Sequence, residues 1–327
     1  MTTPMGVTFG SLGVLGAPAI MDIAKTAESS GYSSLWTVEA NGTDAFSLLG
    51  SVAAVAPGLD LATGIIPVQI RSPSLTAMTA STLQALAPTR NIWLGIGVSA
   101  PGILQQHGQT ATKRPIAMMR EYVALLRECM SGESVTFEGD FWSVKRFRLG
   151  MRIGERKPKI VMAALNPQML KLAGEIADGV LLNYLPASHV ANSVTQIRKG
   201  GDAKIFAYVH AAVSDFERSA NSARKDLFNY SMADSYANMF RQAGFADEID
   251  AIRTCHQNRD REGALAAISE RMIQAINFIG NADEVTQFVS DYAKAGVEYP
   301  ILMPMPWGED RAAVTKATMS AAIKAVG

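Results

Sequence analysis

The stretch KIVMAALNPQMLKLAGEIADGVLLN, residues 159–183, carries the clearest structural pattern in this chain. Its two apolar runs, 159–163 and 179–183, predict short buried strands. Between them, Asn166 and Pro167 open an amphipathic pattern, and asparagine is a favoured N-cap residue while proline is favoured at the first helical position. The order strand, helix, strand therefore predicts two parallel strands joined by a crossover helix.

The same alternation of short apolar runs and helical patterns continues along the whole chain. The predicted strands are 6–9, 34–38, 59–66, 91–98, 159–163, 179–183, 204–211 and 299–303. Eight strand–helix repeats close a barrel. We therefore predict an α/β fold, a (β/α)8 TIM barrel, as one domain over residues 1–327.

Two segments interrupt this repeat. Residues 135–149 alternate like a hairpin around a Gly-Asp turn and precede the fifth strand. Residues 216–272 contain several short helical patterns with polar breaks, which predict a helical insertion after the seventh strand. Because βα loops lie at the catalytic mouth of a barrel, we expect the insertion to lie there and to shape the substrate pocket.

Composition and charge narrow the possible partners. Thirty Lys and Arg balance thirty Asp and Glu, so no overall field favours nucleic acid or an anionic membrane. Hydrophobic residues make up 48% of the chain and charged residues 18%, which indicates a deep core and is consistent with a buried subunit contact. We expect a small-molecule substrate and a homodimer.

The cysteines and the N-terminal residues bear on the cellular compartment that we expect for the protein. Cys129 and Cys255 lie far apart and form no metal-ligand pattern, so we expect neither a disulfide framework nor a metal site. The first residues lack the basic and apolar regions of a signal peptide, and no apolar run has the length of a membrane span. We expect a cytoplasmic protein.

Polar groups and glycines follow the predicted strands at the mouth, where barrel enzymes gather their active sites. Glu39 and Asn41 follow the second strand. They are either site residues or parts of a solvated loop. Gly64 interrupts the third strand, which indicates a bulge, a close ligand approach or a packing glycine. The fourth strand ends in GIGVSAPG, residues 95–102. It is no dinucleotide fingerprint, because Ala100 replaces the third glycine and we expect no helix directly behind it.

The helix beginning at Asn166 offers free backbone N–H groups to an anion such as a cofactor phosphate, although most Asn-Pro starts are simply capped helices. Among the histidines, only His107 follows a glycine-rich mouth loop, which makes it the one proton-transfer candidate. We interpret His189, His210 and His256 as structural.

Five segments, in their order and spacing, resemble the luciferase-like monooxygenase superfamily, in particular its branch that uses the deazaflavin coenzyme F420. They are AKTAESSGYSSLW (24–36), LATGIIPVQIRSP (61–73), NIWLGIGVSAPGILQQHG (91–108), RPIAMMREYVALLRECMSGE (114–133) and PKIVMAALNPQMLKLAGEIADGVLLN (158–183). The resemblance covers nearly the whole chain.

The resemblance implies a third-strand bulge with a non-proline cis peptide at Gly64-Ile65 behind the deazaflavin ring. It also implies a phosphate cradle on residues 163–166, with Val98 and Ser99 bordering the ring and Asn183 beside it. The implied cofactor-binding residues are Glu39, Thr63, Gly64, Ile65, Gly97, Val98, Ser99, Ala163, Ala164, Leu165, Asn166 and Asn183.

Two departures from the family narrow the activity. Glu39-Ala40 stands where many members have Asp-His, and Ala100 stands where relatives carry an acid, which argues against sugar-phosphate oxidation and puts methanopterin reduction in doubt. The leading hypothesis is hydride transfer between C5 of F420 and a small organic substrate, with Glu39, Asn41 and His107 as catalytic residues. The alternatives are an FMN-dependent monooxygenase of the same fold and a cofactor-binding protein without turnover.

Overall fold

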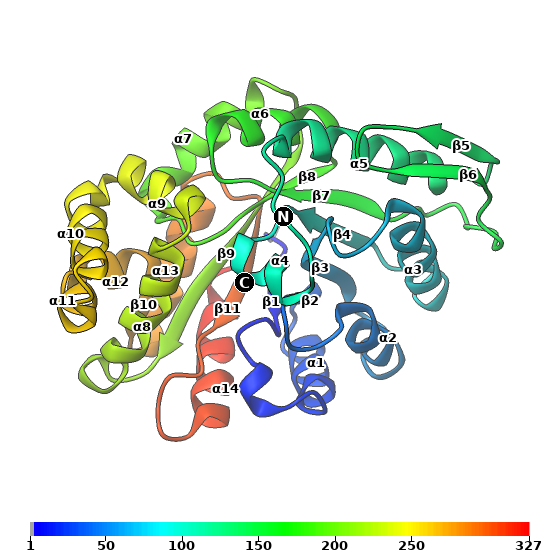
Figure 1. Cartoon of the computed structure of the whole chain (residues 1–327). Coiled ribbons are helices and arrows are strands. Elements are labelled where there is room, and N and C mark those ends of the chain that lie inside the picture. Colours follow the sequence, from blue (N-terminus) through cyan, green and yellow to red (C-terminus); the bar gives the residue numbers. More distant parts are fainter. Residues whose placement is uncertain (1–2, 327) are drawn as a thin grey trace.

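Eight parallel strands form a closed barrel in the computed structural model, which describes residues 3–326 (Figure 1). In sequence order the strands are β1 (Gly6–Thr8), β2 (Ser34–Thr37), β3 (Asp60–Pro67), β4 (Ile92–Gly97), β7 (Lys159–Ala163), β8 (Gly179–Leu182), β9 (Lys204–Val213) and β11 (Tyr299–Pro304). They pair in this order, and β11 closes the barrel against β1. The predicted TIM barrel is confirmed, with each strand displaced by no more than a few residues.

Helices surround the barrel and alternate with its strands (Figure 1). They are α1 (Ala19–Ser29), α2 (Ala45–Val55), α3 (Pro73–Leu86), α5 (Pro115–Cys129), α6 (Pro167–Ile176), α7 (Ala187–Arg198), α13 (Ala282–Lys294) and α14 (Arg311–Ala322), with the short 3-10 turns η1 (Gly13–Leu15) and η3 (Ile323–Ala325). Local sequence explains several starts, since Asp44, Ser72 and Asp310 each accept a hydrogen bond from a first-turn amide. Each helix in residues 3–326 is too short or too polar to cross a bilayer.

The loop after β4 differs from the prediction. A short helix, α4 (Pro101–Gln106), opens directly behind Ala100, so the expectation of no helix there was wrong. Proline at the first helical position is pre-organised for a helix, and it holds the preceding Ala100 in the extended conformation that an N-cap requires.

The hairpin predicted before the fifth barrel strand is present as β5 (Val135–Glu138) and β6 (Ser143–Phe147), which pair antiparallel. The predicted helical insertion is also present, as α8 (Phe216–Ser231), α9 (Asp234–Phe240), the π-helical turn η2 (Arg241–Phe245), α10 (Ala246–Gln257), α11 (Arg261–Ala266) and α12 (Glu270–Ile276). Figure 1 shows the hairpin and helices α10 and α11 at opposite edges of the molecule.

A ninth parallel strand, β10 (Asn277–Gly280), was not predicted. It ends the insertion and pairs with the last four residues of β9, beyond the point where β8 stops. Its four residues, NFIG, are too few for periodicity to separate a strand from a helix end. The strand brings the end of the insertion back to the barrel mouth.

Aromatic rings fill the barrel interior below the mouth. Phe206 packs against Trp36, Trp93 and Tyr299, with ring centroids 5.0–5.4 Å apart. These side chains come from four different strands, so they hold the strands at fixed spacing. The aromatic layer forms a solid floor beneath the residues predicted to bind a cofactor.

Candidate active site at the barrel mouth

The third barrel strand bulges where the sequence places Gly64. Its register against β4 shifts between Thr63 and Ile66, and the peptide bond between Gly64 and Ile65 is cis, as the family resemblance implied. The hydroxyl of Tyr208, from β9 across the barrel, donates to the Gly64 carbonyl over 2.8 Å. Tyr208 therefore supports the bulge from the interior.

Gly95 on β4 leaves the space that the bulge occupies. The Thr63 hydroxyl donates to the Gly95 carbonyl over 2.8 Å, and a Cβ atom on Gly95 would collide with the backbone carbonyl oxygen of Thr63. A glycine here is thus a requirement of close strand approach. Thr63, predicted to bind cofactor, is buried and contributes to the bulge itself.

Three of the predicted cofactor residues meet at one point of the mouth. A Cβ atom on Gly97 would lie 3.2 Å from both the Cδ1 atom of Ile65 and the Cβ atom of Ala163. Gly97 and Ala163 end β4 and β7, and Ile65 lies near the end of the neighbouring strand β3. Their small or half-buried side chains leave an apolar platform at the strand ends, with Val98 and Ser99 half-buried beside it.

The helix α6 begins as predicted at Asn166 and Pro167, but its cap differs. Asn166 has extended backbone angles at the N-cap, yet its side chain accepts no hydrogen bond from the helix and instead donates to the Ser235 carbonyl over 3.0 Å. In the described residues the amides of Gln168 and Met169 have no side-chain cap. Ala164 and Leu165 lead into this uncapped helix start from β7.

Asn183 follows β8 and faces the insertion. Its amide nitrogen lies 3.0 Å from the Tyr236 hydroxyl, and its carbonyl oxygen is buried without a partner in residues 3–326. Ser235 and Tyr236 are consecutive residues of α9, so this one short helix contacts both amide side chains predicted to bind cofactor. The insertion therefore borders the candidate site.

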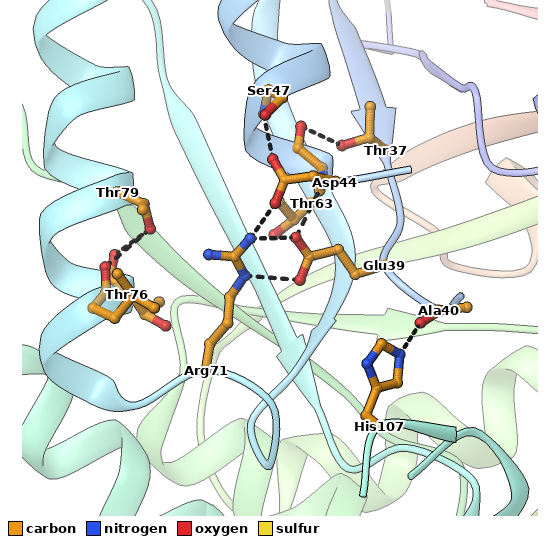
Figure 2. A network of polar contacts seen from close by, with 12 residues as sticks. Thr37, Glu39, Ala40, Asp44, Ser47, Thr63, Arg71, Thr76, Thr79 and His107 are labelled. Carbon is orange, nitrogen blue, oxygen red and sulfur yellow. Dashed lines mark hydrogen bonds and ion pairs between the residues drawn. The ribbon is translucent and has the colours of Figure 1, made fainter. Parts of the chain in front are cut away.

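Glu39 borders the bulge from the other side, because its backbone amide donates to the Ile65 carbonyl over 3.0 Å. Its carboxylate is engaged by Arg71, whose Nε and Nη2 atoms lie 2.8 and 2.7 Å from the two oxygens (Figure 2). The Ala45 amide donates to one of the same oxygens, and Asp44 also pairs with Arg71. The hydrogen-bonded Glu39 carboxylate raises the pKa of Arg71.

Asn41 and His107 lie on the exposed rim of the mouth. Asn41 donates to the side-chain oxygen of Gln106 over 2.7 Å. The Nε2 atom of His107 lies 2.5 Å from the Ala40 carbonyl oxygen (Figure 2). Both contacts join the loop after β2 to α4. The predicted catalytic residues thus lie along one rim, with only Glu39 in direct contact with the bulge.

Sequence reasoning missed Arg71 and a buried polar cluster at the ends of β8 and β9. Arg71 lies 32 residues from Glu39, and no local pattern marks the pair. In the cluster, the Tyr184 hydroxyl and the Asn277 amide donate to the carboxylate of Asp226, which comes from α8. Burial raises the pKa of Asp226 to about 6 despite these hydrogen bonds. The insertion contributes part of the barrel mouth.

The donors and surfaces at the mouth fit a phosphorylated, planar ring cofactor. The uncapped start of α6 offers amides to a phosphate, the platform at Ile65 and Gly97 is apolar, and the Asn183 carbonyl is an unpartnered acceptor for a ring N–H. Within residues 3–326, no three His, Cys, Asp or Glu side chains gather as metal ligands would.

Comparison with known proteins matches the luciferase-like monooxygenase family model over residues 8–299. Over 304 residues the chain is 28% identical to a 5,10-methylenetetrahydromethanopterin reductase of Archaeoglobus fulgidus, covering 88% of this chain and 89% of that one. It is 26% identical to a putative coenzyme F420-dependent oxidoreductase of Mycobacterium tuberculosis, covering 90% and 92%. The fold matches a coenzyme F420 dependent tetrahydromethanopterin reductase from Methanopyrus kandleri over the full length of both chains, with a TM-score of 0.81 at 20% identity.

Proposed function

Since the chain belongs to the luciferase-like monooxygenase family, we propose that it is an F420-dependent oxidoreductase that transfers a hydride between the deazaflavin C5 and a small organic substrate. The observation that carries this proposal is the bulge at Gly64 and Ile65, where Ile65 meets Gly97 and Ala163 from the two neighbouring strands at the barrel mouth. The named F420-dependent relatives support the choice of cofactor.

Each part of the mouth has a role in this proposal. The residues that lead into α6, Ala163 to Asn166, would hold the cofactor phosphate together with the free amides behind Pro167, because a helix start favours an anion. Thr63, Gly64, Ile65, Gly97, Val98 and Ser99 would contact the ring, and Asn183 would accept a hydrogen bond from it. When bound, F420 supplies a carbon that accepts or releases a hydride.

We propose a positioning role for Glu39. Both of its carboxylate oxygens already accept hydrogen bonds from Arg71, so we propose that Glu39 acts as a positioning residue for the bulge and for the loop after β2. Asn41 and His107 lie on the solvent-exposed rim. We propose that Asn41 orients the substrate and that His107 exchanges the proton that accompanies hydride transfer.

A titration of the purified protein with F420 and, separately, with FMN tests the cofactor proposal. Trp36 packs beside Gly64, so its fluorescence reports on binding at the bulge. We expect saturable quenching by F420 at concentrations at least tenfold lower than by FMN, followed by a change of F420 absorbance with a member of a panel of alcohols, ketones, enones and imines.

Each alternative function has its own signature in this experiment. The family includes monooxygenases by name, and tighter FMN binding with oxygen-dependent product formation would replace our proposal with that activity. Tight F420 binding without any absorbance change over the whole panel would indicate a cofactor-binding protein without turnover.

A further inference from the structure

His210 points into the barrel just below its mouth. Phe206, Tyr208 and His210 alternate along β9 and share its inner face, because side chains two apart lie on the same side of a strand. Phe206 belongs to the aromatic floor, and Tyr208 reaches the Gly64 carbonyl. His210 is the next residue on this face toward the carboxyl end, and it is 1% exposed.

A chain of hydrogen bonds orients the His210 ring. The Asp226 carboxylate only accepts hydrogen bonds when ionised, so the Asn277 side chain directs its NH2 group toward it, over 2.7 Å. The Asn277 oxygen is thereby directed at the Nδ1 atom of His210, 3.0 Å away. An oxygen acceptor at that position requires the proton on Nδ1. The Nε2 atom is left with a free lone pair.

The Nε2 atom has no partner in residues 3–326 and is fully buried. The ring of Tyr184 packs edge-on against the imidazole, with centroids 3.9 Å apart, and holds it in place. Burial lowers the pKa of His210 to about 3, so the ring is neutral at physiological pH and acts as an acceptor. A buried acceptor without a donor destabilises the protein, and a hydrogen bond from a bound ligand would remove this cost.

We propose, on the basis of the oxidoreductase function proposed above, that the Nε2 atom of His210 accepts a hydrogen bond from a hydroxyl or N–H group of the molecule bound at the mouth. Asp226, Asn277 and Tyr184 act through His210 and are positioning residues. The donor belongs either to the cofactor ring or to a substrate that carries a hydroxyl or N–H group beside its reacting carbon.

The experiment records two-bond 1H–15N correlations of the histidine rings in 15N-labelled protein, with His210 assigned from the spectrum of His210→Gln. Nitrogen shifts distinguish a free lone pair from one that accepts a hydrogen bond. F420 alone is added first, and then propan-2-ol or cyclohexanol, each compared with its ketone, which lacks the hydroxyl donor. A shift with F420 identifies the cofactor as donor, and a shift with the alcohol but not the ketone identifies the substrate.

Variants provide an independent readout. His210→Phe keeps a buried ring but removes the acceptor. We expect this variant to lower the affinity for the ligand that donates to His210, F420 or the alcohol, at least tenfold. The affinity for the ketone, which has no hydroxyl donor, should not change. His210→Gln, which retains an acceptor, should recover part of the loss. A purely structural histidine would lower both affinities equally, which would contradict the proposal.

The wild-type spectra show whether the Nε2 atom of His210 accepts a hydrogen bond even if His210→Phe does not fold. An Nε2 signal that stays unmoved under saturating F420, alone and with either alcohol, would overturn this proposal while leaving the oxidoreductase function intact. Absence of F420 binding would instead remove the proposed function, and the same titration with FMN would then decide the role of His210.

Discussion

Glu39 and Arg71 form the only bidentate pair among the site residues described above, and neither side chain is more than 14% exposed. Partly buried, charge-assisted pairs of this geometry are stronger than exposed ones. Arg71 is also held by its neighbours, because its guanidinium lies over the Phe46 ring and its backbone carbonyl accepts from Tyr122. The pair thus links the loop after β2 rigidly to the end of β3.

Replacing Glu39 by glutamine tests whether this pair supports the cofactor site. Glu39→Gln removes the charge that holds Arg71, so we expect a loss of about 1–3 kcal/mol in unfolding free energy. We also expect roughly tenfold losses in F420 affinity and in turnover, equivalent to about 1.4 kcal/mol each. Denaturant unfolding and F420 titration measure these effects.

Asp44→Asn is the matched control, because it removes the more exposed partner of Arg71 and retains a side chain that caps α2. Its effects should be small. If Glu39→Gln bound F420 and turned over like the wild type, Glu39 would have no role in the site.

The buried carboxyl of Asp226 makes stability depend on pH. Its pKa is about 6 in the folded protein, whereas the ordinary value of 3.8 applies to the unfolded chain. Between pH 3.8 and about pH 6, therefore, the carboxyl is ionised in the unfolded chain and protonated in the folded protein. Stability from this group is complete below pH 3.8 and is lost as pH rises to about 6, by about 3 kcal/mol in total.

Asp226→Asn removes this dependence. We expect the unfolding free energy of the variant, minus that of the wild type, to rise by about 2.4 kcal/mol between pH 4 and pH 7, because part of the full ~3 kcal/mol is already lost at pH 4. The lowered pKa of His210 makes the protein less stable as pH falls. This contribution is present in both proteins, so it largely cancels in the difference between their unfolding free energies. Urea denaturation followed by circular dichroism gives both values, and a difference that is constant with pH would contradict the assignment.

At the scale of elements, the bulge of β3 packs closely against the backbone of the neighbouring strand β4. The carbonyl of Thr63 occupies the position that a side chain on Gly95 would need. The platform that ends in Ile65 and Gly97 therefore depends on a glycine in the middle of a buried strand, a residue that otherwise weakens strands.

Gly95→Ala tests this dependence. The added methyl group would collide with backbone, which cannot rotate away as a side chain can, so we expect a loss of about 2 kcal/mol or more in unfolding free energy. Weaker F420 binding should follow, because the bulge must move. Gly50→Ala in α2, where nothing lies within 4 Å of the new atom, is the control and should stabilise by about 1 kcal/mol. Equal stability of the two variants would rule out the proposed packing.

At the scale of the whole molecule, α3 presents an apolar stripe to solvent. Leu75, Met78 and Leu86 are 42%, 49% and 58% exposed, and their spacing places them on one face of the helix. Large apolar side chains exposed on one helix face indicate a contact surface. We propose that this face forms the homodimer contact expected from the composition.

Light scattering on the purified protein tests the dimer. We expect twice the chain mass for the wild type at micromolar concentration, and the monomer mass for Leu75→Glu/Met78→Glu, because the charges would be buried at the contact. Val14→Glu changes another exposed apolar residue outside α3 and should remain dimeric. A wild-type monomer, or an unaffected double variant, would exclude this interface.

Local patterns were sufficient for much of the fold. Strand and helix periodicity predicted all eight barrel strands, the hairpin and the helical insertion, because burial of one face imposes a repeat that needs no distant partner. Asn166 and Pro167 predicted the start of α6 correctly. Pro101 also stands at a first helical position, but the short helix α4 that it begins was not predicted. The four-residue β10 was too short for any period.

The amino-acid sequence alone determined the barrel, the interrupted third strand at Gly64 and the helix start at Asn166, since each depends on neighbouring residues. Only the tertiary structure revealed that Arg71 engages Glu39, that the Asn166 side chain contacts Ser235 without capping its helix, and that Asp226 and Asn277 orient His210. These partners lie 32 to 69 residues apart. Which polar groups meet is decided by strand closure and by the return of the insertion to the mouth, and no local pattern records either.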